Sequence, residues 1–344
     1  MGIILAILLF SGIIIFHELG HFTLAKLNGI RVEEFSLGLG PTIIGKEFHG
    51  TKFCLKLLPF GGACMMGEDD VDDMSEGSFN SKSVWARISV ILAGPVFNII
   101  MALAFSIIMV GWIGYDSTVV KSVDSGYSAA EQGIQAGDEI TGINGKSVHL
   151  WKEINLYRVM NKDEDSVEIK YERDGKEHTA NVEMRKLGED TYKRLGISGS
   201  AENTRAGFFK SIQYGAYTLR YWVDYTVDCL KMFVTGQVGV KDLSGPVGIV
   251  HVVDDTYKAA APEGMKVVIL NLLNFAILLS ANLGVINMLP IPALDGGRFV
   301  FLLIEAVRKK RVPPEKEGMV HFAGFAALMI LMVVVMFNDI RQLF

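Results

Sequence analysis

The sequence predicts a polytopic α-helical membrane protein with about four transmembrane helices, a membrane-associated β-hairpin or sheet region and an extracytoplasmic α+β domain. Three observations predict this class. Half of the 344 residues are hydrophobic, and the mean hydropathy is positive at +0.32. Four nearly uncharged stretches are each long enough to cross about 30 Å of hydrocarbon. Between the second and third stretches, short alternating segments are separated by Asn-Gly and Asp-Gly pairs, which is typical of hairpins.

The four apolar stretches define the predicted spans. They cover residues 2–27, 88–114, 267–289 and 319–337. The first has no basic leading region and no small-residue cleavage site, so we expect a retained helix and not a removable signal. The first predicted domain, residues 1–114, contains two spans and a cytoplasmic or re-entrant β region at about 28–86. Residues 115–190 form the α+β domain, and residues 191–264 form an interfacial amphipathic helix and a linker. Residues 265–344 contain the last two spans.

A basic loop orients these spans. Residues 308–311 read Arg-Lys-Lys-Arg, and short loops rich in Lys and Arg stay in the cytoplasm. Both chain ends and residues 115–266 then lie outside, and His17 lies within the bilayer toward its cytoplasmic side. The net charge of −5 and the lack of a basic stripe argue against a nucleic-acid partner. Cys54, Cys64 and Cys229 match neither a metal-ligand spacing nor a disulfide framework.

The first span contains the stretch "FHELGH", which is costly in lipid. His17 and His21 are four residues apart and share one helix face, with Glu18 between them. This spacing is typical of a zinc site in which the glutamate acts as general base. A chance match would suit a soluble surface helix better, because an ionisable group at bilayer depth costs about 2.5–3.5 kcal/mol. A bound cation would compensate that cost, with Zn²⁺ favoured by the ligand types and iron or cobalt as other occupants.

A third ligand is expected, because catalytic zinc usually takes three protein ligands and leaves one position open. Asp295 is the only carboxylate between Lys266 and Glu305, and it follows an apolar span in "NMLPIPALDGG". Taken alone, Asp followed by two glycines is equally consistent with a plain turn. Combined with the histidine pair, the ligand interpretation is favoured.

These motifs resemble the site-2 protease family, and most closely its RseP type of intramembrane zinc metalloprotease, here with a single PDZ domain. The resemblance rests on residues 17–21, on residues 287–297 and on the insert between them, in the family's order. Residues 244–249, "SGPVGI", also resemble a family segment. The resemblance implies that His17, His21 and Asp295 hold Zn²⁺ and that Glu18 activates water. It further implies that Asn287, Pro290 and Pro292 engage an unwound substrate.

Two features bear on how a helical substrate would be unwound and held. Pro290 and Pro292 break a helix and leave backbone unpaired at membrane depth, which favours a cavity or a second chain there over a simple helix end. Within residues 30–62, Lys52, Cys54 and Lys56 alternate with apolar neighbours. We expect strands or a re-entrant hairpin that could add a substrate strand; a purely structural sheet is the alternative.

Other segments leave alternatives open. Asn98, in "ILAGPVFNII", could bond across helices or line the active site. The insert resembles a PDZ domain, which could bind a peptide or C-terminal tail or, as we slightly favour, act as a size filter. Residues 207–236 are rich in aromatic residues but interrupted by charges, so they predict an interfacial helix and not a fifth span.

The predicted function is intramembrane zinc endopeptidase activity on transmembrane helices of single-pass membrane proteins, in a bacterial inner membrane. The resemblance implies regulated intramembrane proteolysis, with anti-sigma factors or remnant signal peptides as substrates. The competing hypothesis is a non-catalytic membrane adaptor with a PDZ domain and a structural metal site. Glu18 argues against the adaptor, because a structural site needs no base. A metal transporter would show repeated halves, and the sequence contains no such repeat.

Overall fold

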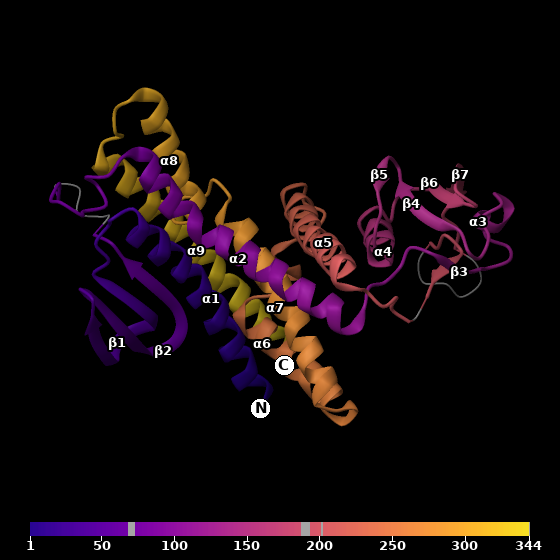
Figure 1. Cartoon of the computed structure of the whole chain (residues 1–344), viewed down its shortest axis with the longest axis horizontal. Helices are drawn as coiled ribbons and strands as arrows, with labels where there is room; N and C mark the ends of the chain where they lie inside the picture. The colour runs from indigo at the N-terminus through magenta and orange to yellow at the C-terminus, as the bar shows by residue number, and fades with distance from the viewer. Residues whose placement is uncertain (68–72, 187–192, 201, 344) are drawn as a thin grey trace. The chain divides into compact units, whose positions relative to one another are not determined.

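Four long apolar helices dominate the computed structural model, which describes residues 1–67, 73–186, 193–200 and 202–343 (Figure 1). They are α1 (Gly2–Leu27), α2 (Val84–Ile113), α7 (Met265–Asn287) and α9 (Pro314–Leu343). Among the described residues, these four are long and apolar enough to cross a membrane. The prediction of a polytopic membrane protein with four spans is confirmed.

The chain forms two compact units. One contains Met1–Ala102 and Cys229–Phe344, and the other contains Leu103–Asp228. Helix α2 and helix α5 (Phe208–Val234) each run from one unit into the other. The domain boundaries expected from the sequence remain predictions, and the one at 190/191 lies outside the described residues.

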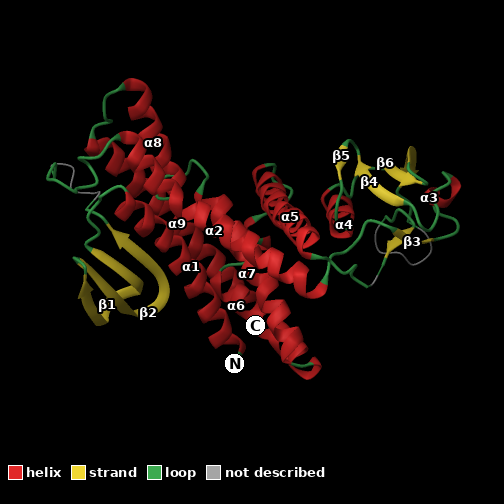
Figure 2. Cartoon of the chain, in the orientation of Figure 1, coloured by secondary structure: helices red, strands yellow, loops and turns green. Residues whose placement is uncertain are grey.

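The first unit contains the expected hairpin, drawn as yellow arrows in Figure 2. Strands β1 (Glu34–Phe48) and β2 (Thr51–Met65) are antiparallel and are joined by His49 and Gly50, both at positive φ. The start of β1 is paired on both sides, because Phe35 lies opposite Phe53 and also opposite Cys64. The end of β2, residues 62–65, therefore forms an outer edge of this sheet.

The hairpin carries large apolar side chains on its surface, consistent with the membrane-associated sheet that the sequence predicts. Those between 37% and 63% exposed are Ile43, Ile44, Phe48, Phe53, Leu55, Leu57, Leu58 and Met65. Large exposed apolar surfaces are uncommon on soluble proteins and often mark membrane or protein contacts. Burial in lipid would remove this surface from water.

Helix α6 (Pro246–Ala260) lies in the first unit beside α1, α7 and α9. Its start explains the "SGPVGI" stretch. The buried carboxylate of Asp339, from α9, accepts hydrogen bonds from the backbone N–H groups of Gly245 at 3.1 Å and Gly248 at 2.8 Å. A Cβ at either glycine would lie within 3.0 Å of that carboxylate. The arrangement is a helix N-cap supplied from another helix, with negative charge at the positive end of the helix dipole.

A buried ion pair holds helix α8 (Asp295–Arg308) against α2. Arg87 of α2, only 4% exposed, bonds through both terminal nitrogens to the two carboxylate oxygens of Glu305. Such a two-pronged pair fixes orientation as well as distance. It therefore anchors the far end of the helix that begins at Asp295.

The second unit is an α+β domain. In chain order it contains β3 (Val120–Val123), α3 (Ser128–Glu131), β4 (Glu139–Ile143), β5 (Lys146–Ser147), α4 (Trp151–Met160), β6 (Ser166–Arg173), β7 (Lys176–Glu183) and β8 (Ile197–Gly199). One sheet has the order β5-β4-β6-β7, and β3 pairs with β8. The predicted Asn-Gly and Asp-Gly turns are present, since Asn144, Gly145, Asp174 and Gly175 all have positive φ.

The core of this domain follows the predicted alternation along β6. Val167, Ile169 and Tyr171 are all buried, whereas the intervening residues are less so. Asp138 is also buried and binds Arg173 at 2.6 and 2.7 Å. Burial alone would raise the pKa of Asp138, but the Arg173 guanidinium lowers it below its usual value. The ion pair therefore stabilises this domain at neutral pH, and that contribution is lost on strong acidification.

Helix α5 packs on α2 through small residues. Ser211, Gly215 and Thr218 are buried, and a Cβ at Gly215 would lie 2.6 Å from the Ile107 side chain. Small residues of this kind let membrane helices approach closely. Helix α5 is not among the four helices apolar enough to span, in line with the four-span prediction.

Candidate metal centre

The histidine pair is buried within the first unit. His17 and His21 are 7% and 6% exposed and lie one turn apart on α1. Gly20 lets α2 approach this turn closely, because a Cβ there would lie 2.4 Å from the backbone oxygen of Ala93. Helix α2 thus covers the face of α1 that carries the two imidazoles.

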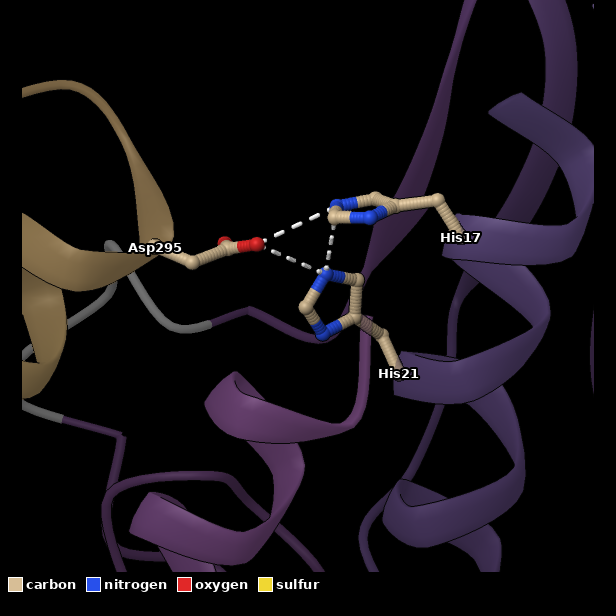
Figure 3. Close-up of side chains that lie close together, drawn as sticks. All are labelled: His17, His21 and Asp295. Atoms are coloured by element: carbon tan, nitrogen blue, oxygen red, sulfur yellow. Dashed lines mark hydrogen bonds and ion pairs between the residues drawn. The ribbon is translucent and has the colours of Figure 1, made fainter. Parts of the chain in front are cut away.

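Three side chains from two distant parts of the chain, α1 and α8, converge here (Figure 3). The Nε2 atoms of His17 and His21 are 3.2 Å apart, and the Asp295 Oδ2 atom lies 3.1 Å from the first and 3.4 Å from the second. Asp295 is the first residue of α8, following a sharp loop after α7. The sequence places it directly after an apolar span but does not predict this separate helix.

The cluster fits a zinc ion. Tetrahedral ligands about 2.0–2.1 Å from zinc would be separated from one another by about 3.3 Å, close to the three separations observed. The buried Asp295 Oδ2 has no hydrogen bond among the described residues. Within the described part of the chain, this is the one group of three or more His, Cys, Asp or Glu side chains able to hold a metal.

Neighbouring groups orient both imidazoles. The His21 Nδ1 lies 2.8 Å from the Val90 carbonyl, to which it donates, so that Nε2 is left as the ligand atom. The His17 Nδ1 lies 3.1 Å from the side-chain amide of Asn98, which is fully buried. The nearer atom is the amide nitrogen, and the buried Asn98 Oδ1 has no hydrogen bond among the described residues. If the amide is turned by 180°, Oδ1 accepts from the His17 Nδ1–H and the Nε2 lone pair is left for the metal. The structure therefore places Asn98 beside the predicted ligand His17.

Gly94 is required by the close fit of α2 over the cluster. A Cβ at this position would lie 2.3 Å from the His21 Nε2 atom and 2.7 Å from the His17 Cε1 atom. Pro95 follows, and because it has no N–H, the carbonyl four residues earlier is not bonded within the helix. That carbonyl belongs to Ile91, which lines the adjacent cavity.

A cavity of about 500 Å³ opens beside the cluster. Glu18 lines it, and its carboxylate accepts a hydrogen bond from the backbone N–H of Cys64, in the outer edge of β2. Other lining residues are Glu33, residues 62–67, Asn287, Ala293 and Arg298. A base, a candidate metal centre and a strand edge therefore share one cavity.

The remaining predicted residues divide into two groups. The Asn287 side-chain amide lines the cavity and lies 3.5 Å from the His17 Nε2 atom. Pro290 and Pro292 lie in the loop between α7 and α8 and are not among the residues that line the cavity, although the adjacent Ala293 is. Their predicted contact with substrate stays a prediction. The sequence did not predict that Arg298 lines the cavity or that Cys64 contacts Glu18. The two glycines at 61 and 62 were the one sequence signal that β2 approaches α1 closely there.

Comparisons with known proteins identify the family of the whole chain. The model of the family described as Peptidase family M50 matches residues 5–331. A protein of Clostridium acetobutylicum is 38% identical over 98% of this chain and 97% of its own length. The zinc metalloprotease RasP of Bacillus licheniformis and the regulator of sigma-W protease RasP of Bacillus subtilis are each 33% identical, over 99% of both chains.

Two solved structures are similar to part of the chain. The PDZ domain of the SdrC-like protein from Listeria monocytogenes is 29% identical, with a TM-score of 0.23, and covers 25% of this chain and 88% of that one. The corresponding domain from Listeria innocua is 30% identical, with a TM-score of 0.23, over 26% of this chain and all of that one.

Proposed function

The chain belongs to peptidase family M50, and from that premise we propose that His17, His21 and Asp295 hold its zinc while Glu18 acts as general base. The protein is a multi-pass membrane zinc metalloprotease. The observation that carries the residue assignment is the convergence of three ligand atoms within 4.8 Å of one another, beside Glu18 in one cavity.

Each side chain has a distinct role in peptide hydrolysis. Zinc, when bound, supplies Lewis-acid activation of water and of the scissile carbonyl. Glu18 takes the proton from the attacking water and delivers it to the leaving amine. The Asn287 amide, at the rim of the cluster, hydrogen-bonds the unwound substrate backbone. Pro290 and Pro292 keep the loop between α7 and α8 from forming helix, so that its backbone remains available to an unwound substrate. A structural metal site in an adaptor would need no such base.

We propose that the outer edge of β2 binds the substrate by strand addition. The Met65 carbonyl accepts from the Glu33 N–H, on the β1 side. Successive residues of a strand point their backbone groups to opposite sides, so those of Gly62 and the carbonyl of Cys64 face the cavity, while the Cys64 N–H bonds Glu18. A transmembrane helix hides its own backbone groups, and pairing with this edge would hold it extended beside Glu18.

Cysteine cross-linking tests this pairing. In a Glu18→Gln background with the three native cysteines replaced by alanine, Met65→Cys should cross-link to cysteines placed singly along a model transmembrane substrate. Strand addition predicts cross-links at every second substrate position, because strand side chains alternate. Lys46→Cys, on the exposed distal part of β1, should give none. Cross-links at every third or fourth position would show a bound helix and contradict strand addition.

We propose that the metal centre faces the cytoplasmic side and that the PDZ-like domain is extracytoplasmic. His21 lies six residues, about 9 Å, before α1 ends at Leu27, and Asp295 begins the helix that leads into the basic loop at Arg308. Short basic loops stay in the cytoplasm. The charged side chains of Glu33 and Arg298 line the cavity and would favour the entry of the water that hydrolysis consumes.

Membrane proteins are the substrates, and we propose single-pass ones cut within their transmembrane segments in regulated proteolysis. The relative from Bacillus subtilis is named a regulator of sigma-W protease, which makes anti-sigma factors one expected class. Remnant signal peptides are the other, since each is a lone apolar helix.

For the PDZ-like domain, we propose that a peptide tail with a free carboxylate binds between α4 and β8. A cavity of about 220 Å³ lies there, lined by Trp151 and Ile154 and by the arginines Arg158 and Arg194. Among the described residues, strand β8 pairs with β3 alone, and we propose that its other edge receives the peptide.

Binding of short labelled peptides to the full chain in detergent tests this assignment. Peptides with a free carboxylate should bind more tightly than amidated ones, and Arg158→Ala with Arg194→Ala should abolish that difference. Lys176→Ala, at the exposed tip of another hairpin, should not change it. Equal binding of both peptide forms would instead favour the size filter, for which cleavage should depend on whether the substrate has a folded ectodomain.

A further inference from the structure

The loop that delivers Asp295 has an unusual backbone. Ala293, two residues before Asp295, has a φ of 78°. Residues with a Cβ rarely adopt this conformation, and they keep it only where the surroundings impose it. The sequence offers no signal of this, because glycine is the usual residue at such positions.

The hydrogen bonds of the loop show what imposes it. Pro290 and Pro292 have no N–H, so between Leu289 and Leu294 only Ile291 and Ala293 can donate from the backbone. The Ile291 N–H donates to the Leu289 carbonyl at 2.7 Å. The Ala293 N–H donates to the Nδ1 atom of His321, in α9, at 3.0 Å.

Helix α9 also fits closely against the loop at a second point. A Cβ at Gly324, three residues after His321, would lie 2.5 Å from the Pro292 Cβ and 2.6 Å from its carbonyl oxygen. The His321 ring lies 5.4 Å from that of Phe301, in α8. The imidazole is therefore held between the loop and the helix that begins at Asp295.

We propose that His321 is a positioning residue for the carboxylate ligand Asp295. By accepting the Ala293 N–H, its Nδ1 atom holds Ala293 at positive φ and so sets where α8 begins. That placement brings the Asp295 Oδ2 atom within 3.4 Å of both imidazole Nε2 atoms. His321 itself is not part of the metal-binding cluster. The inference rests on the proposed metal site.

Metal affinity and a spectroscopic probe test it on the purified full chain. His321→Leu should weaken zinc binding, measured by competition with a chelator, by about 10–100-fold. This is the range typical of losing a residue that supports a metal ligand without binding the metal. The visible absorption of Co²⁺ bound in place of zinc should change as well. His321→Asn should keep the zinc affinity and the Co²⁺ spectrum of the wild type, because the Asn Oδ1 atom can take the place of Nδ1. His321→Gln should not, because its polar atoms lie farther along the side chain.

A second-site change separates positioning from packing. Ala293→Gly should recover zinc affinity in the His321→Leu background, because glycine adopts positive φ without steric cost. Phe322→Leu, at a neighbouring exposed position of α9, should behave as wild type. Equal loss in the Leu and Asn variants with no recovery by Ala293→Gly would overturn the inference.

Asp295→Ala, measured in parallel, identifies which proposal fails. If Asp295→Ala loses zinc affinity while His321→Leu keeps it, His321 does not position the ligand. If Asp295→Ala also keeps it, the proposed metal site itself is wrong.

Discussion

A Glu18→Gln variant should keep its zinc and lose cleavage of a model transmembrane substrate by about 10³-fold, since general-base catalysis typically contributes about 10²–10⁴. The carboxylate lines the cavity beside the metal cluster without belonging to it. Glutamine keeps its shape and its contact with the Cys64 N–H but cannot take a proton from water. The substitution therefore separates hydrolysis from metal binding.

Zinc content and the cleavage rate must be measured on the same preparation. Glu47→Gln, at an exposed position of the β1–β2 hairpin, is a matched control that should retain both. Undiminished cleavage by the Glu18 variant would remove the proposed mechanism. Loss of zinc together with cleavage would mean that Glu18 is part of the metal site and not its base.

Gly94→Ala should weaken zinc binding and lower cleavage by about 100-fold or more, since a misplacement of about 1 Å can cost that much. The added Cβ would lie 2.3 Å from the His21 Nε2 atom, which is the atom assigned to the metal. The ring must move or α2 must withdraw, and either change separates the ligands. In an ordinary helix the same substitution would be stabilising by about 1 kcal/mol.

Gly12→Ala provides the control for Gly94→Ala. Gly12 lies in α1 with nothing within 4 Å of an added Cβ, so the variant should bind zinc and cleave as wild type. If Gly94→Ala also kept its zinc affinity, as measured with a chelator, the close fit of α2 over the imidazoles would not be part of the site.

Elements with a strong local pattern could be predicted from the sequence. The four spans are long apolar runs, and α1 matches its prediction of residues 2–27. The Asn144–Gly145 turn was predictable because few residue pairs tolerate two successive positive φ values. His17 and His21 were recognisable because helix geometry alone places them on one face.

Tertiary contacts were not predictable from local pattern. The sequence did not predict α8 because Asp295 follows an apolar run directly, which favours the end of a span. The position of α8 is set by tertiary contacts, namely the preceding loop and the ion pair of Glu305 with Arg87 of α2. The role of Asn98 could not be predicted from the sequence because its partner, His17, is 81 residues away. His321 carries no motif, and only the strained backbone of Ala293 draws attention to it.

X-ray absorption at the zinc edge, on the full chain loaded with one equivalent of zinc, tests the central claim most directly. Ligation by His17, His21 and Asp295 predicts a shell of nitrogen and oxygen at about 2.0–2.2 Å with two imidazoles, falling to one in His21→Ala. Sulfur at about 2.3 Å, or two imidazoles persisting in His21→Ala, would contradict it.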